Sequence, residues 1–262
     1  LQLAIQGKLV EQDKNDEPAS VLLERIKEER DKLVKEKKIK KPKPLPEITD
    51  EEKPFEIPDS WEWVRINDIC NVKGGKRIPK GYTFSDGKTE HVYLRVTDMK
   101  CGTILDGDIK YISEEVYDMI KNYLISSDDL YITIAGTIGA VGKIPLKYNN
   151  MNLTENASKL SFYKKLECDL DYIKYSIESN LVQNQFKDKV NKMAQPKLAL
   201  KEIESTIIPL PPLAEQKRIV EKVDELFALI DELDSNKEDL LEVINLTRNQ
   251  VLQEAIQGKL VE

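Results

Sequence analysis

Apolar residues recur in alternating steps of four and three along the C-terminal part of the chain. They fill eight of ten heptad positions between residues 219 and 251, where only Lys237 and Thr247 are polar. This spacing is typical of a coiled-coil seam and predicts one continuous helix over residues 213–257. At roughly 1.5 Å per residue, the helix would be about 67 Å long. The predicted seam consists of Ile219, Val223, Leu226, Ile230, Leu233, Leu240, Ile244 and Val251.

This seam needs a partner, because a long exposed apolar stripe is rarely tolerated on a monomer. No other segment of the chain has a helical pattern long enough to cover it. In a twofold dimer the same surface serves both subunits, so the stripe can bury itself. We therefore predict that the chain forms a homodimer through residues 213–257.

The rest of the chain has two other patterns. Residues 19–38 have helical spacing, and four prolines between residues 42 and 54 predict an extended linker. From residue 55 to about 210, short alternating apolar runs separated by glycines predict strands and turns, and residues 113–123 and 169–190 have helical spacing. We predict an α+β (mixed α/β) fold with a mixed sheet. Its three parts are an N-terminal segment, a globular domain and a long helix, over residues 1–54, 55–210 and 211–262.

An eleven-residue element occurs at both ends of the chain. LQLAIQGKLVE at residues 1–11 recurs as LQEAIQGKLVE at residues 252–262, with ten of eleven positions identical. The repeat favours one period of a longer tandem design over chance, although a cloning artefact or a swapped terminus would also give it. The chain starts with Leu1 rather than Met, so we expect the true start to lie elsewhere.

Charge is distributed unevenly along a chain whose net charge is −7. Residues 211–262 hold 12 acidic and 6 basic residues, whereas 73–100, 130–165 and 187–201 are locally basic. Such local patches can contact phosphates while the whole protein stays acidic. Three separated cysteines are a poor disulfide framework and favour a reducing cytoplasm. One histidine excludes a multi-histidine metal site, and no apolar run is long enough to span a bilayer.

Motifs for catalysis are weak or incomplete. Residues 136–143 are rich in glycine, but their glycine spacing is wrong for a phosphate-binding loop and Ile144 stands where Ser or Thr is required. A strand and tight turn is the better interpretation. Asp59 and the later pair Asp108 and Lys110 have the residue types of a magnesium nuclease, but their separation favours coincidence. The sequence also lacks the Asn/Asp-Pro-Pro-Tyr motif of amino-methyltransferases.

Several segments of the chain are distinctive in combination. They are residues 57–65 (IPDSWEWVR), 93–99 (YLRVTDM), 135–139 (AGTIG), 209–220 (PLPPLAEQKRIV), 16–20 (DEPAS) and 255–260 (AIQGKL). Together they resemble the DNA specificity subunits of type I restriction–modification systems. The first three resemble parts of the family's target recognition domain, and residues 209–220 resemble the start of its long spacer helix. Members usually carry two recognition domains and two spacer helices, whereas this chain has one of each and resembles a half-subunit, natural or truncated.

The resemblance implies a non-catalytic, cytoplasmic subunit that binds double-stranded DNA and reads one half of a bipartite target. It implies that separate modification subunits bind S-adenosylmethionine and methylate adenine, and that separate restriction subunits use ATP and Mg²⁺. This chain would scaffold both, bind no cofactor or metal itself and have no membrane partner. The two spacer helices of a full subunit are antiparallel, so we expect the same of the homodimer. We expect the modification subunit to bind the face of residues 213–257 away from the seam.

Base reading requires polar side chains that reach base edges, and phosphate anchoring requires Lys, Arg and backbone amides. Two other interpretations stay open: a stand-alone nuclease or methyltransferase, which would act without partners, and a coiled-coil adaptor, which would show no sequence preference. The candidate DNA-binding residues are Lys76, Arg77, Lys80, Tyr82, Arg95, Lys100, Thr137, Lys143, Lys192, Gln195 and Lys197.

Overall fold

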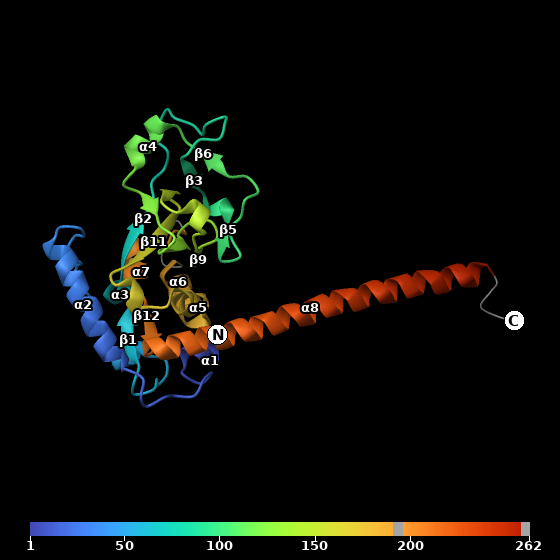
Figure 1. The fold of residues 1–262 in the computed structure, drawn as a ribbon, viewed down its shortest axis with the longest axis horizontal. Coiled ribbons are helices and arrows are strands. Elements are labelled where there is room, and N and C mark those ends of the chain that lie inside the picture. The colour runs from blue at the N-terminus through green and yellow to red at the C-terminus, as the bar shows by residue number, and fades with distance from the viewer. Residues whose placement is uncertain (191–195, 258–262) are drawn as a thin grey trace. The chain divides into compact units, whose positions relative to one another are not determined.

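The computed structural model describes residues 1–190 and 196–257, and it divides into two compact units (Figure 1). The first unit is Leu1–Ile219, and the second begins at Val220. The first contains strands and short helices together, and the second is part of the long helix α8 (Leu213–Ile256). This confirms the predicted mixed α+β class and the predicted C-terminal helix.

Two helices precede the strands. They are α1 (Gln2–Ile5) and α2 (Ala19–Lys35). Ala19, Leu22 and Ile26 are buried along one face of α2, as expected for residues three and four apart. Pro18 is the residue directly before the helix, and the Ala19 N–H donates to the Ser60 carbonyl over 2.9 Å. The predicted linker is irregular except for the short 3₁₀ turn η1 (Asp50–Glu52).

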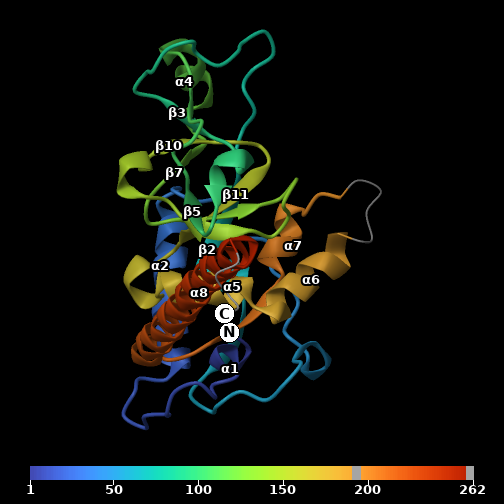
Figure 2. The ribbon, with the colours of Figure 1, turned by 90° about the vertical axis from the view of Figure 1, so that its right-hand side faces the viewer.

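The strands of the first unit form two four-stranded sheets and two isolated pairs (Figures 1 and 2). One sheet has the order β2-β11-β8-β9 and is antiparallel throughout. The other has the order β6-β3-β10-β7 and is mixed, because β10 pairs parallel with β3. The pairs are β1-β12 and β4-β5. The strands are β1 (Glu62–Arg65), β2 (Cys70–Gly74), β3 (Val92–Leu94), β4 (Met99–Lys100), β5 (Thr103–Ile104), β6 (Lys110–Tyr111), β7 (Leu124–Ile125), β8 (Leu130–Thr133), β9 (Val141–Lys143), β10 (Met151–Leu153), β11 (Ala157–Phe162) and β12 (Ile207–Leu210).

The remaining helices of this unit are short. One predicted helix, over residues 169–190, is two helices that meet at Ser179. There the backbone is extended, with ψ 153°, and the Ser179 hydroxyl donates to the Ser176 carbonyl over 2.6 Å. That bond replaces helical pairing, which explains the break. The helices are α3 (Ile66–Ile69), α4 (Glu114–Ile120), α5 (Leu170–Glu178), α6 (Asn180–Val190) and α7 (Leu200–Glu204), and the other 3₁₀ turns are η2 (Val96–Asp98), η3 (Leu146–Tyr148) and η4 (Lys165–Glu167).

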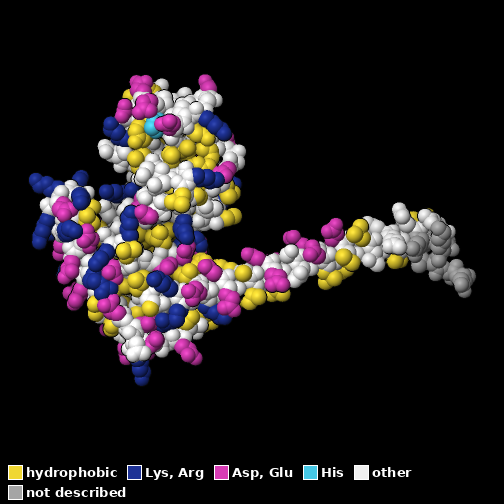
Figure 3. Space-filling view, in the orientation of Figure 1, with side chains coloured by type: hydrophobic (Ala, Val, Ile, Leu, Met, Phe, Trp, Pro, Cys, Tyr) yellow, Lys and Arg dark blue, Asp and Glu magenta, His cyan; other side chains and the backbone are white. Residues whose placement is uncertain are grey.

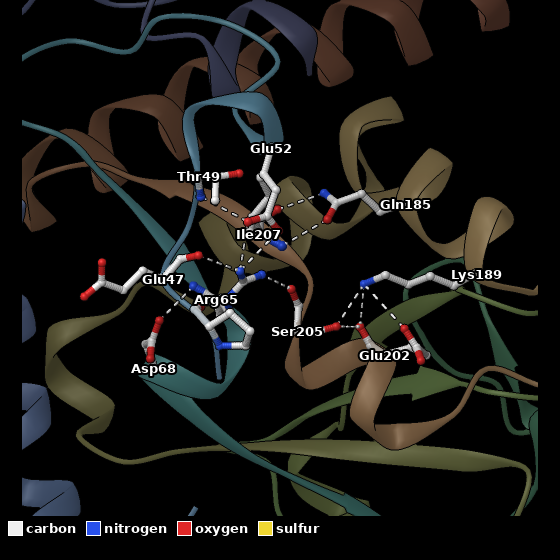
Figure 4. Close-up of polar contacts among 11 residues, drawn as sticks. Glu47, Thr49, Glu52, Arg65, Asp68, Gln185, Lys189, Glu202, Ser205 and Ile207 are labelled. Carbon is white, nitrogen blue, oxygen red and sulfur yellow. Dashed lines mark hydrogen bonds and ion pairs between the residues drawn. The ribbon is translucent and has the colours of Figure 1, made fainter. Parts of the chain in front are cut away.

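A buried arginine ties the linker to the domain (Figure 4). Arg65, at the end of β1, is 6% exposed. Its guanidinium donates to the Pro46 carbonyl over 3.0 Å, the Ser205 carbonyl over 2.8 Å and both carboxylate oxygens of Glu52 over 3.0 and 3.1 Å. Three segments far apart in the sequence therefore meet at one side chain.

The first turns of α8 are held by the same residues that carry the family resemblance. The buried Glu215 carboxylate accepts from the Trp61 indole N–H over 2.8 Å. The Gln216 side chain donates to the Pro211 carbonyl over 3.0 Å and accepts from the Asp169 amide over 2.8 Å. Arg218 forms an ion pair with Asp16 at 2.6 Å. The motif at residues 209–220 therefore joins the helix to the domain.

Beyond these turns, α8 exposes apolar residues (Figure 3). Of the predicted seam, Ile219 and Val223 are buried, and Leu226, Ile230, Leu233, Leu240, Ile244 and Val251 are exposed. Phe227, Leu229, Leu241 and Val243 are also exposed and directly flank the seam in the heptad pattern. The exposed apolar stripe is therefore wider than the seam alone.

Candidate nucleic-acid interface

Five chain segments converge at one edge of the first unit. We call residues 75–77, 95–97, 134–139, 154–156 and 196–198 the loop edge. Backbone hydrogen bonds connect them: Lys76 N–H to the Leu153 carbonyl over 2.8 Å, Thr154 N–H to Leu94 over 3.1 Å, Ile134 N–H to Asn156 over 2.8 Å, and Leu198 N–H to Ile134 over 2.9 Å. The strand register therefore fixes loops that are up to 120 residues apart in the sequence.

Glycine makes one of these close approaches feasible. A Cβ atom at Gly75 would lie 2.1 Å from the Thr154 carbonyl oxygen and 2.3 Å from that of Leu153. Only a residue without a side chain allows the two loops to pass at this distance. Gly75 therefore lets the following Lys76 and Arg77 approach the turn at residues 154–156.

Glu155 lies at the centre of the loop edge. Its carboxylate accepts from Arg77 Nε over 3.2 Å and from the Tyr93 hydroxyl over 3.2 Å, and its carbonyl accepts from Lys197 Nζ over 3.5 Å. Burial raises the pKa of Tyr93 to about 12, so this hydroxyl stays protonated and can also donate to the Lys76 carbonyl over 2.8 Å. A single acidic residue thus contacts two of the predicted basic residues, Arg77 and Lys197.

One contact fixes the orientation of the Arg77 side chain, which stays largely exposed to solvent. Its side chain is 75% exposed, and only Nε is used in the contact with Glu155. Within residues 1–190 and 196–257, its two terminal amino groups make no hydrogen bond. An arginine held in this way presents a planar pair of donors, the geometry that recognises guanine or a phosphate.

A hollow of about 460 Å³ adjoins Arg77. Its lining combines aromatic and polar residues: Arg77, Ile78, Phe84, Tyr93, Arg95, Val96, Thr97, Thr154, Glu155 and Asn156. Phe84 packs on Tyr93 with ring centroids 5.7 Å apart and is 36% exposed. Exposed amide, hydroxyl and guanidinium groups beside an apolar surface are the groups that contact base edges and thymine methyls.

Arg95 has a different environment. Two of its nitrogens donate to the buried carboxylate of Asp98 over 2.7 and 3.1 Å, and one contacts Asp108 over 3.3 Å. The hydrogen bonds with Asp98 raise the pKa of Arg95. Its guanidinium also lies 6.0 Å from the centre of the Phe84 ring. These contacts fix the loop after β3 and hold the exposed Thr97 at the hollow.

The structure brings together only some of the predicted DNA-binding residues. Lys76, Arg77, Arg95, Thr137 and Lys197 belong to the loop edge. Exposed Lys80 and half-buried Tyr82 follow Arg77 in the chain, and the Tyr82 hydroxyl donates to Glu115 of α4 over 2.6 Å. Lys192 and Gln195 lie outside the described residues.

Lys100 and Lys143 lie together at another place. The Lys143 amide donates to the Gly102 carbonyl over 2.9 Å, which joins β9 to the β4-β5 hairpin that carries exposed Lys100. The Lys143 ammonium contacts both carboxylate oxygens of Asp171 at 2.9 and 3.0 Å. Residues 136–143 form a turn and strand β9, as the sequence predicted.

Four residues at this site were not predicted from the sequence: Glu155, Asn156, Thr97 and Phe84. One signal was present: Glu155 is the only acidic residue in the basic stretch 130–165, and it sits in a polar turn between two apolar runs. Thr97 and Phe84 carry no comparable signal. Among the described side chains, no three His, Cys, Asp or Glu residues are grouped so as to hold a metal, and none of the described helices has the length and apolar content of a membrane span.

Comparison with known proteins finds one family. Residues 58–243 match the family described as "Type I restriction modification DNA specificity domain". The chain is 37% identical over 240 residues to the type I restriction enzyme EcoAI specificity subunit of Escherichia coli, covering 89% of this chain and 39% of that protein. It is 32% identical over 240 residues to the EcoEI specificity subunit of Escherichia coli, covering 90% and 40%. The chain thus spans about two fifths of the length of these relatives.

Solved structures share the fold. The HsdS subunit from Thermoanaerobacter tengcongensis has a TM-score of 0.54 and 16% identity, covering 92% of this chain and 56% of that one. A chain from a study of complex assembly and conformational transition of the type I R-M system has a TM-score of 0.63 and 18% identity, covering 92% and 57%.

Proposed function

Because the chain belongs to the type I restriction–modification DNA specificity family, we propose that it reads one half of a bipartite duplex target through the loop edge. The supporting observation is that exposed Arg77, Thr97 and Asn156 line one hollow together with Glu155. Arginine can pair with guanine O6 and N7, asparagine with adenine, and a carboxylate with the cytosine amino group. The loop edge therefore has donors and acceptors for several base types.

Arg77→Ala should weaken binding to the preferred duplex by about 1–3 kcal/mol and relax the preference at one base pair, because a guanine loses its bidentate partner. A randomised-target selection followed by fluorescence anisotropy at several salt concentrations measures both quantities. Arg248→Ala removes another exposed arginine, on α8, and serves as the matched control that should keep the preference.

The same selection distinguishes a base contact of Arg77 from a phosphate contact. A uniform loss over all sequences, with a salt slope smaller by about one, would identify a phosphate contact instead of a base contact. Lys143→Ala should also weaken binding, but by less than Arg77→Ala, since Asp171 already neutralises Lys143 in the free protein. Unchanged binding in both variants would contradict the proposed roles.

The chain is further proposed to act without catalysis of its own. In this proposal it works in the cytoplasm and scaffolds a modification subunit that binds S-adenosylmethionine and a restriction subunit that uses ATP and Mg²⁺. Two chains pair antiparallel through α8, so that each end of the dimer carries one reader. A twofold pair of identical readers requires an inverted-repeat target with an unread middle. Methylation or cleavage of DNA by the purified chain alone would contradict this division of labour.

α8 is the proposed surface for the modification subunit. Leu246 is 62% exposed and lies off the seam, and residues 211–262 carry 12 acidic against 6 basic residues. A chain ending at Lys222 keeps the contacts of Glu215, Gln216 and Arg218 with the domain. It should lose at least about tenfold in affinity for the modification subunit, because that surface has been removed. A pull-down with purified subunits measures this, and full recruitment by the shortened chain would defeat the proposal.

A further inference from the structure

The two copies of the eleven-residue element have opposite environments. α1 ends at Ile5 and α8 ends at Ile256, which are the same position of the repeat. Ile5 is 1% exposed, whereas Ile256 is 86% exposed. The isoleucine at the end of the helix is therefore buried in one copy of the repeat and exposed to solvent in the other.

The first copy occupies a shaped seat. Ala4 and Ile5 are buried, and Gly7 has a left-handed backbone with φ 68°. A Cβ atom at Gly7 would lie 2.5 Å from Pro58 Cγ and 3.4 Å from the Trp61 ring, so only glycine fits. We call this site, formed by Pro58, Trp61 and the first turn of α8, the repeat seat.

A buried carboxylate closes the repeat seat. Glu215 accepts from the Trp61 indole over 2.8 Å and from the Gln12 side chain, which also donates to the Gly7 carbonyl over 3.4 Å. The seat is therefore specific for a helix end followed by a glycine.

The sequence of the second copy has the residues that occupy the repeat seat in the first copy. It keeps alanine, isoleucine and glycine at 255, 256 and 258. Its one difference, Glu254 in place of leucine, corresponds to Leu3, which is 54% exposed in the occupied seat. The repeat thus differs only where the seat leaves the side chain in solvent. Residues 258–262 lie outside the described part of the chain.

The position of the second copy along α8 brings it near the seat of a second chain. In an antiparallel pair whose seam uses the exposed positions from Leu226 to Val251, these two residues lie opposite each other. Ile256, five residues beyond Val251, then comes level with Glu221 of the other chain, six residues from Glu215 of its repeat seat. This alignment, unlike the contacts above, rests on the dimer under the proposed function.

We propose that residues 252–262 of one chain are an alternative occupant of the repeat seat of a second copy of this chain. The element would then exchange between chains, and the C-terminal end of each α8 would be anchored on the partner's domain. In a single chain, residues 1–11 fill the seat with the advantage of a short tether, whose effective concentration is of the order of millimolar.

The first test uses the one position that differs. Leu3→Glu makes residues 1–11 identical to residues 252–262. If the seat accepts the second copy, this variant should melt within about 2 °C of the parent chain, since a surface change alters stability little. Ile5→Asp is the comparison that disrupts the seated residue. A Leu3→Glu variant destabilised as much as Ile5→Asp would overturn the proposal.

The second test measures directly whether the C-terminal copy of the element binds the repeat seat. A fluorescent peptide of residues 250–262 is titrated into the full chain carrying Leu233→Asp and Leu240→Asp, so that the outcome does not depend on dimer formation. Adding Ile5→Asp should raise peptide affinity at least tenfold, because the competing copy is weakened, and the same peptide with Ile256→Asp should not bind. If circular dichroism shows that Ile5→Asp unfolds the domain, Ile5→Ala replaces it.

The results of the peptide titration distinguish exchange at the repeat seat from formation of the homodimer. Equal binding of the parent and Ile256→Asp peptides would overturn exchange at the seat, whatever the oligomeric state. Specific peptide binding by a chain that is monomeric without any substitution would support the seat and remove the proposed homodimer.

Discussion

Leu233→Asp together with Leu240→Asp is expected to leave a folded chain that sediments as a monomer at micromolar concentration. The two leucines are 67% and 60% exposed on α8 and lie near the middle of the predicted seam. Twofold symmetry places each substitution in the interface twice, and burying a leucine contributes about 1.5–3 kcal/mol. The dimer should therefore weaken by at least ~1,000-fold, which sedimentation velocity over a concentration series measures.

Leu246→Asp provides the matched control for this experiment. Leu246 is 62% exposed on the same helix but falls outside the seam positions, so this variant should still dimerise. Its circular dichroism should match that of the seam variant, because both changes occur on the exposed surface of α8. A parent chain that is monomeric at micromolar concentration, or equal loss of dimer in both variants, would contradict pairing through the seam.

Arg65→Ala is expected to lower the free energy of unfolding by about 1.5–3 kcal/mol, because it removes the hydrogen bonds of a buried charged side chain. Pro46, Glu52 and Ser205 would all lose a donor, but Pro46 and Glu52 are exposed and can bind water instead. For a chain of this size the change corresponds to a decrease of roughly 3–12 °C in the melting temperature. Differential scanning calorimetry measures the decrease, and limited proteolysis should show earlier cleavage within residues 41–53.

Arg77→Ala is the control for Arg65→Ala. It removes the same side chain at a position that is 75% exposed, so the stability should change by no more than about 0.5 kcal/mol. Equal melting temperatures for the two variants would show that the linker is held by other contacts.

Periodicity in the sequence was sufficient for the two longest of the described helices. The heptad pattern predicted α8 to within a residue or two of its observed ends, and the spacing of Leu22 and Ile26 predicted α2. Such patterns are local, because residues three and four apart share a helix face whatever the rest of the chain does. The pattern failed at Ser179, where a side chain bonded to the backbone interrupts a helix without changing the apolar spacing.

The candidate interface depended on tertiary structure. The sequence identified basic stretches and glycine turns, but the tertiary structure decided that Arg77 and Lys197 meet at Glu155 while Lys143 pairs with Asp171. Composition also did not indicate that Arg95 donates hydrogen bonds to Asp98, or that Glu155 accepts a hydrogen bond from its basic neighbour Arg77. These contacts join residues far apart in the chain, so no local pattern can encode them.

The eleven-residue repeat shows, within one element, what the sequence determines and what the tertiary structure decides. The sequence by itself determined that residues 1–11 and 252–262 share a helix end and a following glycine. Only the tertiary structure decided that Ile5 is buried, with the following Gly7 against Pro58 and Trp61, while Ile256 is exposed. The physical reason is that burial depends on what surrounds a side chain, and two identical segments can differ completely in their surroundings.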